Sequence, residues 1–296
     1  MNSSNGNGVL FSLLIATCGR KEPLVRLLDS LCEQTEQNFE VLVGDQNPSG
    51  ILDEILGQYR ERLAIIPLPV AVKAASQARN ALIPKARGTF IAFPDDDCLY
   101  APDTLEKVRQ VFLRAPQAGG LLARWCPLED LKSGSFPAHS RLPGPISRYA
   151  AFRHSETWRM FYRRQAVAAV DGFDPALGPG EHTAFAAADD TDFLLRIMDR
   201  GFKIIRPAEV RVYHPPVKYG DPLLPDKNKA YCAARMHLLR KHSMPFWFTA
   251  GNIAYPLLVL PFEGPKAWNY RWDMFRWRLS YFFQERPPEA SRRLGT

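Results

Sequence analysis

The stretch SQARNALIPKARGTFIAFPDDDCLY, residues 76–100, decides the fold. Its first part has helical periodicity that extends over about 75–86, and TFIAFP at 89–94 is a short apolar run that predicts a buried strand. Three consecutive carboxylates, at positions 95–97, follow that strand directly. Open α/β sheets bind ligands at the carboxyl ends of their strands, so the acidic turn is a candidate ligand site.

The residues before this stretch repeat the alternation of strand and helix. Strands are predicted over 9–16, 39–45 and 63–68, and helices over about 22–34 and 51–61. Such alternation predicts an α/β fold whose mostly parallel sheet is covered by helices on both faces. Thr17 and Asp45 follow their strands as the acidic turn follows its own, so we expect all of these side chains to converge on one rim.

The residues after this stretch are less regular. Residues 127–150 contain four prolines and little periodicity, which predicts a long loop over the site. A strand near 157–162, a short helix at 163–170, a loop at 171–182, a helix at 190–200 and a strand pair over 203–214 are expected to follow.

Composition and charge limit the class of protein. The chain has 296 residues, 46% of them hydrophobic, and five scattered cysteines without a CxxC pair, which argues against a disulfide scaffold or a zinc ribbon. Residues 1–8 lack the features of a secretory leader. Residues 227–296 carry 12 Lys/Arg against 4 Asp/Glu, whereas 1–226 carry 26 against 27. The basic end is either a contact surface for something anionic or a solvated tail.

Two acidic clusters carry the chemistry. Asp95, Asp96 and Asp97 repel one another and offer the hard oxygen ligands that suit Mg²⁺ or Mn²⁺; the alternative is an exposed turn in which Asp97 caps the next helix. The second cluster, ADDTD at 188–192, begins a helix. Its acids either cap that helix or supply a general base beside the pocket.

The third candidate is Arg79, in the sequence Gln77-Ala78-Arg79-Asn80 of the 75–86 helix. An arginine there could contact a phosphate or a carboxylate, or it could be an ordinary charged helical residue.

Taken together, IATCGR, VGDQNPSG, residues 76–100, VDGFD and ADDTDFLLRIMDRGF resemble a family 2 glycosyltransferase with the GT-A fold, over about residues 10–214. The resemblance implies an inverting transferase that uses a nucleoside-diphosphate sugar and Mn²⁺ or Mg²⁺. It also implies a domain over 1–220, with a nucleotide-sugar half at about 9–125 and an acceptor half at about 126–220, followed by a basic, aromatic-rich helical region at 221–296.

The resemblance also implies roles for individual residues. Those that would bind the nucleotide sugar are Thr17, Arg20, Asp45, Arg79, Asp95 and Asp96. The metal ligands would be Asp97, Asp95 and His214, although a histidine at a strand end is as often bonded to backbone. Asp190 lies at the position of the family's catalytic base, and because the usual Glu-Asp pair is Asp-Asp here, Asp189 and Asp192 remain alternatives.

Missing motifs exclude or weaken other functions. The QxxRW motif of processive synthases is absent from 193–296, which predicts a non-processive enzyme. A sugar-nucleotide nucleotidyltransferase should open with a GGxGxR-like loop, but residues 16–20 contain one glycine. A non-catalytic nucleotide-sugar-binding or scaffold protein is the third hypothesis, and it would be favoured if Asp190 proved dispensable.

The C-terminal region suggests where the enzyme works. Residues 245–262 are almost uncharged but contain three prolines, so we expect an interfacial or buried segment, not a membrane span. An aromatic and apolar stripe flanked by Arg271, Arg276 and Arg278 follows; it comprises Trp268, Trp272, Phe275, Leu279 and Phe282. It predicts either a helix in a membrane interface or a terminal helix packed on the core.

The expected partners are therefore a sugar nucleotide, a glycan or lipid-linked acceptor and an anionic membrane surface, with no nucleic acid. The expected location is the cytoplasm, peripheral to the inner face of the membrane.

Overall fold

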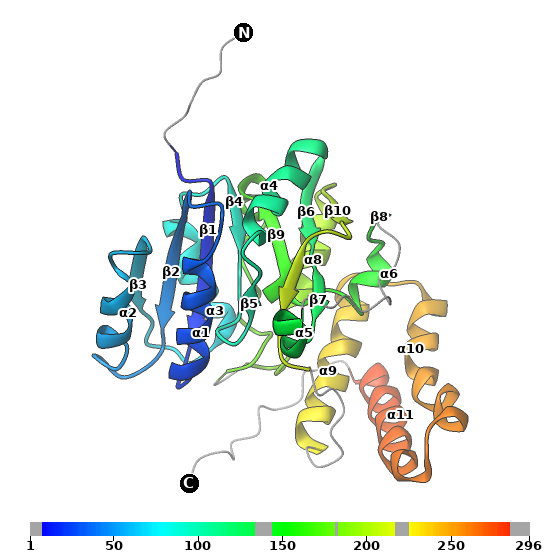
Figure 1. Ribbon diagram of the computed structural model, residues 1–296. Helices are drawn as coiled ribbons and strands as arrows, with labels where there is room; N and C mark the ends of the chain where they lie inside the picture. The colour runs from blue at the N-terminus through cyan, green and yellow to red at the C-terminus, as the bar shows by residue number, and fades with distance from the viewer. Residues whose placement is uncertain (1–7, 134–143, 181–182, 217–224, 285–296) are drawn as a thin grey trace.

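The computed structural model describes residues 8–133, 144–180, 183–216 and 225–284 (Figure 1). The segment examined for a secretory leader, much of the 127–150 loop and the end of the basic region lie outside these residues. The strands are β1 Phe11–Thr17, β2 Phe39–Asp45, β3 Ile65–Pro69, β4 Phe90–Ala92, β5 Leu99–Tyr100, β6 Ala118–Leu122, β7 Arg124–Cys126, β8 Gly144–Pro145, β9 Met160–Arg163, β10 Lys203–Arg206 and β11 Arg211–Tyr213.

The helices alternate with the strands in the first half of the chain and dominate its end. They are α1 Lys21–Cys32, α2 Asp53–Tyr59, α3 Ala75–Leu82, α4 Thr104–Arg114, α5 Leu128–Ser133, α6 Arg148–Ala151, α7 Arg164–Ala168, α8 Asp189–Asp199, α9 Pro225–Lys241, α10 Phe246–Leu258 and α11 Trp268–Phe283. Four 3₁₀ turns are η1 Ile83–Lys85, η2 Thr157–Arg159, η3 Leu260–Phe262 and η4 Pro265–Ala267. The helix expected over 75–86 changes to the 3₁₀ turn η1 at Pro84, which has no N–H for the α-helical ladder.

An eight-stranded sheet forms the centre, in the order β3-β2-β1-β4-β9-β6-β10-β8. The pairs among β3, β2, β1 and β4 are parallel, as is β6 with β10, whereas β9 is antiparallel to both of its neighbours. The expected mostly parallel sheet is therefore confirmed.

Both faces of this sheet are buried, as the apolar runs predict. On β1, Leu13 and Ile15 belong to a core cluster with α1, α2 and α4, while Leu14 lies in a second cluster with α3, α7, α8 and α9. Successive side chains of a strand point to opposite faces, so a strand covered on both sides is apolar except where buried polar groups satisfy one another, as Ser12 of β1 does by donating to Glu40 of β2 at 2.7 Å. The two clusters hold the sheet rigidly, and its strand ends become a firm platform.

The strand pair expected over 203–214 is wrong in one respect. β10 joins the large sheet beside β6, but β11 lies between β5 and β7 in a separate three-stranded sheet. Pro207 follows β10 and has no N–H with which to continue the ladder. The consequence is functional, because β11 pairs Tyr213 with Leu99 and so carries the next residue, His214, toward the acidic turn.

The region expected to be one long loop at 127–150 contains short elements in its described part. α5 opens it, and β8 and the start of α6 close it. β8 pairs antiparallel with β10 at the edge of the large sheet.

Helices α9, α10 and α11 gather at one corner of the molecule, beside the β10 end of the sheet (Figure 1). α9 buries Ala233, Ala234 and Met236 in the same core cluster as α8, so this region is packed onto the sheet domain. In the described part of the chain, no helix combines the length and the hydrophobicity that crossing a membrane requires.

Candidate active site

The strand ends meet on one rim, as expected. β1 and β2 are parallel and in register, so Thr17 lies opposite Asp45. The buried Thr17 hydroxyl donates to Oδ2 of Asp96 at 2.8 Å, which joins the first strand end to the acidic turn after β4. Oδ1 of Asp45 accepts from the backbone N–H and the side-chain amide of Asn47, at 2.9 and 2.7 Å, and so shapes the loop after β2.

The three acids of the turn have different partners. Asp95 pairs with Arg79, whose Nη2 is 3.0 Å from Oδ1. Arg20 Nη1 lies 3.2 Å from Oδ1 of Asp96 and 2.7 Å from Oδ2 of Asp97. Burial raises the pKa of Asp96 to about 6 against the opposing hydrogen bond from Thr17. Arg20 is thus committed to the acids of this turn.

Asp97 faces His214, which β11 delivers to the site. Nε2 of His214 is 3.1 Å from Oδ1 of Asp97. Burial by itself would raise the pKa of Asp97, but the contact with His214 and the charge of Arg20 hold that pKa below its usual value. Trp158 stacks on the imidazole with ring centroids 4.3 Å apart and fixes its plane.

Asp95, Asp97 and His214 offer ligand atoms that lie within 4.8 Å of one another. Two observations fit a divalent ion. Oδ1 of Asp97 is buried and accepts no well-formed hydrogen bond, and Nδ1 of His214 lies 2.7 Å from the carbonyl of Pro215. Donation from Nδ1 to that carbonyl leaves the Nε2 lone pair for a metal. Carboxylate oxygens with one imidazole suit Mn²⁺, and Mg²⁺ less closely.

Arg79 connects the two acidic clusters. Its side chain is 9% exposed; Nη1 lies 2.8 Å from Oδ2 of Asp189 and 3.5 Å from Oδ1 of Asp190, and Nη2 pairs with Asp95. These neighbouring carboxylates raise the pKa of Arg79 despite its burial, which alone would lower it. The sequence left open whether Arg79 contacts a phosphate or a carboxylate. In the structure, carboxylates contact both of its terminal nitrogens.

The second cluster begins α8 after an unusual residue. Ala188 has φ 74°, in the left-handed region that side-chain-bearing residues rarely adopt, and the chain turns there to start the helix. Gly178 lies close to the side chain of Asp189. A Cβ at position 178 would lie 2.7 Å from Cγ of Asp189, and Gly178 has a φ of +92°. The position of Asp189 therefore depends on a glycine with positive φ.

Asp190 is the more accessible acid of the pair. Its side chain is 27% exposed, compared with 7% for Asp189. Oδ2 of Asp190 accepts from the Thr157 backbone N–H at 3.0 Å, and Oδ1 accepts from the Thr157 hydroxyl. Burial, followed by the charge of Asp189, raises the pKa of Asp190 to about 7, the range in which a general base works well at neutral pH.

Asp192 does not share this site. It is completely buried and pairs with Arg196 at 2.7 Å, Lys241 at 2.7 Å and His242 at 2.9 Å. Burial alone would raise the pKa of Asp192, but these partners lower it far below its usual value. Two residues along a helix are about 200° apart, so Asp190 and Asp192 face opposite directions. Asp192 joins α8 to α9, and we remove it from the candidate bases.

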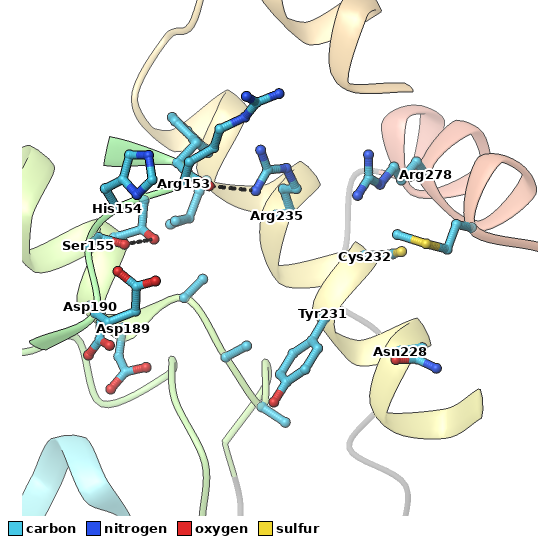
Figure 2. A pocket seen from close by; sticks show the side chains of 18 of the residues that line it. Arg153, His154, Ser155, Asp189, Asp190, Asn228, Tyr231, Cys232, Arg235 and Arg278 are labelled. Carbon is cyan, nitrogen blue, oxygen red and sulfur yellow. Dashed lines mark hydrogen bonds between the residues drawn. The ribbon is translucent and has the colours of Figure 1, made fainter. Parts of the chain in front are cut away.

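A cavity of about 680 Å³ borders Asp189 and Asp190 but not the acidic turn, and it is walled by the loop at 152–156, α8, α9, α10 and α11 (Figure 2). Sequence reasoning named Asp189 and Asp190 but missed Arg153, Arg235 and Thr157, and it assigned Arg278 to the edge of the aromatic stripe and not to this cavity. No motif marks these residues, because the cavity forms only where α9–α11 pack against the rest of the chain.

Solved structures share this fold. Staphylococcus aureus TarS, residues 1–349, superposes with a TM-score of 0.60 at 17% identity, over 93% of this chain and 72% of that one. A mannosyltransferase from Pyrobaculum calidifontis, in complex with GDP-Man and Mn²⁺, superposes with a TM-score of 0.57 at 17% identity, over 94% of this chain and 72% of that one. The fold is therefore that of the GT-A glycosyltransferases, as expected.

Sequence comparison is more specific. The family described as glycosyl transferase family 2 matches residues 12–157. An uncharacterized glycosyltransferase of Haemophilus influenzae is 24% identical over 284 residues, 90% of each chain. The Escherichia coli UDP-Glc:alpha-D-GlcNAc-diphosphoundecaprenol beta-1,3-glucosyltransferase WfaP is 28% identical over 88 residues, 30% of this chain and 35% of that one. The chain is therefore a glycosyltransferase with a family 2 match over residues 12–157, and these comparisons give no support to the nucleotidyltransferase hypothesis.

Proposed function

We propose that this glycosyltransferase is an inverting, metal-dependent, non-processive enzyme that moves one sugar from a nucleoside-diphosphate sugar to a glycan or lipid-linked acceptor. One observation carries the proposal: two acidic clusters with different surroundings lie on either side of Arg79. One contains the group of potential metal ligands, and the other presents Asp190, with its raised pKa, to a cavity.

The proposed chemistry is a single displacement. Asp190 accepts the proton of the acceptor hydroxyl as that oxygen attacks the anomeric carbon, and the bond from this carbon to the diphosphate breaks with its electrons on the leaving group. Thr157 orients the carboxylate through both of its oxygens. Asp189, the less exposed acid of the pair, holds Arg79 in place at 2.8 Å.

Asp95, Asp97 and His214 would hold Mn²⁺ or Mg²⁺. A bound divalent ion stabilises the charge that develops on a leaving diphosphate. Arg20 neutralises the remaining charge of Asp96 and Asp97. Thr17 and Asp45, at the adjacent strand ends, are the proposed base and ribose side of the donor site. The named ligands of the structural relatives, GDP-Man with Mn²⁺ and UDP-GlcNAc, support a donor of this class.

The proposal is tested with a panel of sugar nucleotides and Mn²⁺, in which donor hydrolysis and transfer are both followed. In the Asp190→Asn variant, donor binding should survive while transfer falls by roughly 10²–10⁴-fold, the usual scale for the loss of a general base. Proton NMR of the product should show an inverted anomeric configuration. Retention of configuration, or normal transfer by Asp190→Asn, would refute the mechanism.

We also propose that the enzyme is peripheral at the cytoplasmic face of the membrane and contacts it through residues 227–283. The outer surface of α10, η3 and α11 exposes large apolar side chains, including Phe262 at 87%, Phe246 at 76% and Phe283 at 74%. Such a surface suits the headgroup region of an anionic bilayer.

The structure alters the expected stripe in detail. Trp268, Trp272 and Leu279 are exposed, whereas Phe275 and Phe282 pack against the core. Arg278 is buried and Arg271 pairs with Glu263, so neither flanks a lipid-facing stripe. Arg276 remains exposed.

Liposome co-sedimentation tests the membrane contact. The triple variant Phe262→Ser, Trp268→Ser and Trp272→Ser should lose binding to anionic vesicles. The control is Leu113→Ser, which changes a 69% exposed apolar residue on α4. Binding should weaken with salt. If the unchanged protein stays in the supernatant with every lipid, the proposal fails.

A further inference from the structure

The cavity beyond Asp190 has one acidic end and one basic end. Asp189 and Asp190 line it on one side; Arg235 of α9 and Arg278 of α11 line it on the other, and Arg153 comes from the loop between α6 and η2 (Figure 2). The α9 residues that line it recur at helical spacing and form one face, which extends over about 15 Å at 1.5 Å per residue. They are Asn228, Tyr231, Cys232, Arg235 and Leu238.

The arginines at the basic end bind only neutral groups within the described residues. Arg235 donates Nε to Oδ1 of Asn252 at 2.7 Å and Nη1 to the carbonyl of Phe152 at 2.9 Å. Arg278 donates Nη1 to the carbonyl of Asn252 at 2.6 Å. Across the described ranges, neither of these arginines, nor Arg153, forms an ion pair with a carboxylate. Buried Arg79, by contrast, pairs with carboxylates through both terminal nitrogens.

Arg278 also has an unused donor. The residue is 7% exposed, and its Nε is buried without a hydrogen-bond partner. Burying a charge is unfavourable unless an opposite charge or hydrogen bonds compensate for it, and a buried donor left unpaired adds to that cost. Burial, with the positive charge of Arg278 nearby, lowers the pKa of Arg235 to about 9, so the Arg235 guanidinium remains charged at neutral pH.

The acidic residues of the cavity do not relieve this charge, because each is engaged elsewhere. Glu156 pairs with Arg159, and Asp189 pairs with Arg79. Asp190 accepts hydrogen bonds from Thr157 and lies 3.5 Å from Nη1 of Arg79. The three arginines therefore leave an uncompensated positive region in a cavity whose size suits a ligand.

We propose that Arg235 and Arg278, with Arg153 beside them, bind an anionic group of the acceptor, a phosphate or a carboxylate, while the acceptor hydroxyl lies at Asp190. This inference rests on the proposed function and defines the class of acceptor. The planar guanidinium matches both oxyanions in geometry. The donor diphosphate is a poor candidate for this place, since Asp95, Asp97 and His214 lie beyond Arg79 and do not line the cavity.

The test compares one sugar presented with and without charge. Three acceptors carry that sugar. The first is a neutral octyl glycoside, the second is the octyl glycoside of the corresponding uronic acid, and in the third a diphosphate links the sugar to farnesol. We expect transfer to one or both charged acceptors and little to the neutral one. Preference for the diphosphate-linked acceptor identifies a phosphate as the bound group. Preference for the uronic acid glycoside identifies a carboxylate.

Variants then assign the effect to the arginines. Arg235→Gln and Arg278→Gln should each raise the KM for the charged acceptor by about 10- to 100-fold, the scale of a hydrogen bond to a charged group, without changing the KM for the donor or its hydrolysis. The matching Lys variants should recover part of this loss, which a purely structural role would not predict. Arg276→Gln, exposed on the same helix, is the control and should behave like the unchanged protein.

A binding measurement covers the case in which no acceptor of the panel reacts. Inorganic diphosphate, added with EDTA, should raise the Tm of the Asp97→Ala protein, whose metal site is disabled. Adding Arg153→Gln, at an exposed position, to this protein should reduce that rise. Equal use of neutral and charged acceptors, an unchanged KM in the Gln variants, or no diphosphate effect on Tm would overturn the inference. Failure of the transferase proposal itself is separate, because it appears as normal transfer by Asp190→Asn.

Discussion

The replacement of Thr157 by valine tests how the base is tuned. Thr157 donates twice to Asp190, through its backbone N–H at 3.0 Å and through its hydroxyl. Valine has nearly the same shape and keeps the backbone donor but lacks the hydroxyl. The variant therefore removes one hydrogen bond from the ionised form of Asp190 and leaves the packing of η2 largely unchanged.

The size of the effect follows from the geometry. A hydrogen bond to a charged group contributes about 1.5–3 kcal/mol, and one pKa unit corresponds to about 1.36 kcal/mol. The pKa of Asp190, raised to about 7 by burial and by Asp189, should rise by a further ~1–2 units. A base must be deprotonated to act, so kcat/KM rises with pH through this pKa and then levels. At pH 7 the active fraction should fall from about half to about 1–10%.

The assay is a pH profile of kcat/KM with saturating donor for the unchanged protein, Thr157→Val and Thr157→Ser. The valine variant should be about 5- to 50-fold slower at pH 7 and should approach the unchanged rate above pH 9. Serine retains the hydroxyl and should keep the original profile. An equal loss at every pH would mean that Thr157 has only a structural role, and an unshifted valine profile would mean that Asp190 is not the base.

Three further outcomes are expected. Asp97→Ala should abolish the metal-dependent rise in Tm caused by nucleoside diphosphates while the metal-free protein stays folded; equal nucleotide affinity with and without EDTA would contradict the metal site. Asp192→Ala should lower the free energy of unfolding in urea by about 3–5 kcal/mol at pH 7, because it removes the completely buried carboxylate that Arg196, Lys241 and His242 share, whereas the half-exposed Asp199→Ala should cost about 1 kcal/mol or less. Since the folded pKa of Asp192 is depressed, this difference should shrink as the pH falls below about 4. Gly178→Ala should displace Asp189 and reduce kcat by roughly 10²-fold with donor binding retained; unchanged kcat would show that the close contact relaxes without consequence.

Most elements of the first hundred residues follow from sequence, for a simple reason. In β1 and β2 every residue except Ala16 and Asp45 is buried, so a nearly continuous apolar run identifies each strand without knowledge of its partners. The acidic residues that follow the strands are equally visible. Prediction fails where the pairing of a strand depends on distant segments. β10 and β11 are close in sequence but belong to different sheets, and no local pattern distinguishes this arrangement from a hairpin.

The sequence by itself determined the α/β class, the rim of strand ends, and the two acidic clusters from which a base and metal ligands could be drawn. Only the tertiary structure decided among the acids. The rotation of α8 against its neighbours directs Asp190 to the cavity and Asp192 to Lys241 and His242, and that rotation comes from packing, not from helical periodicity. The same holds for Arg278. The sequence of α11 shows interspersed aromatic and basic residues, but the burial of Arg278 depends on the packing of α11 against α9 and α10. The local sequence of α11 does not indicate which helices it will contact.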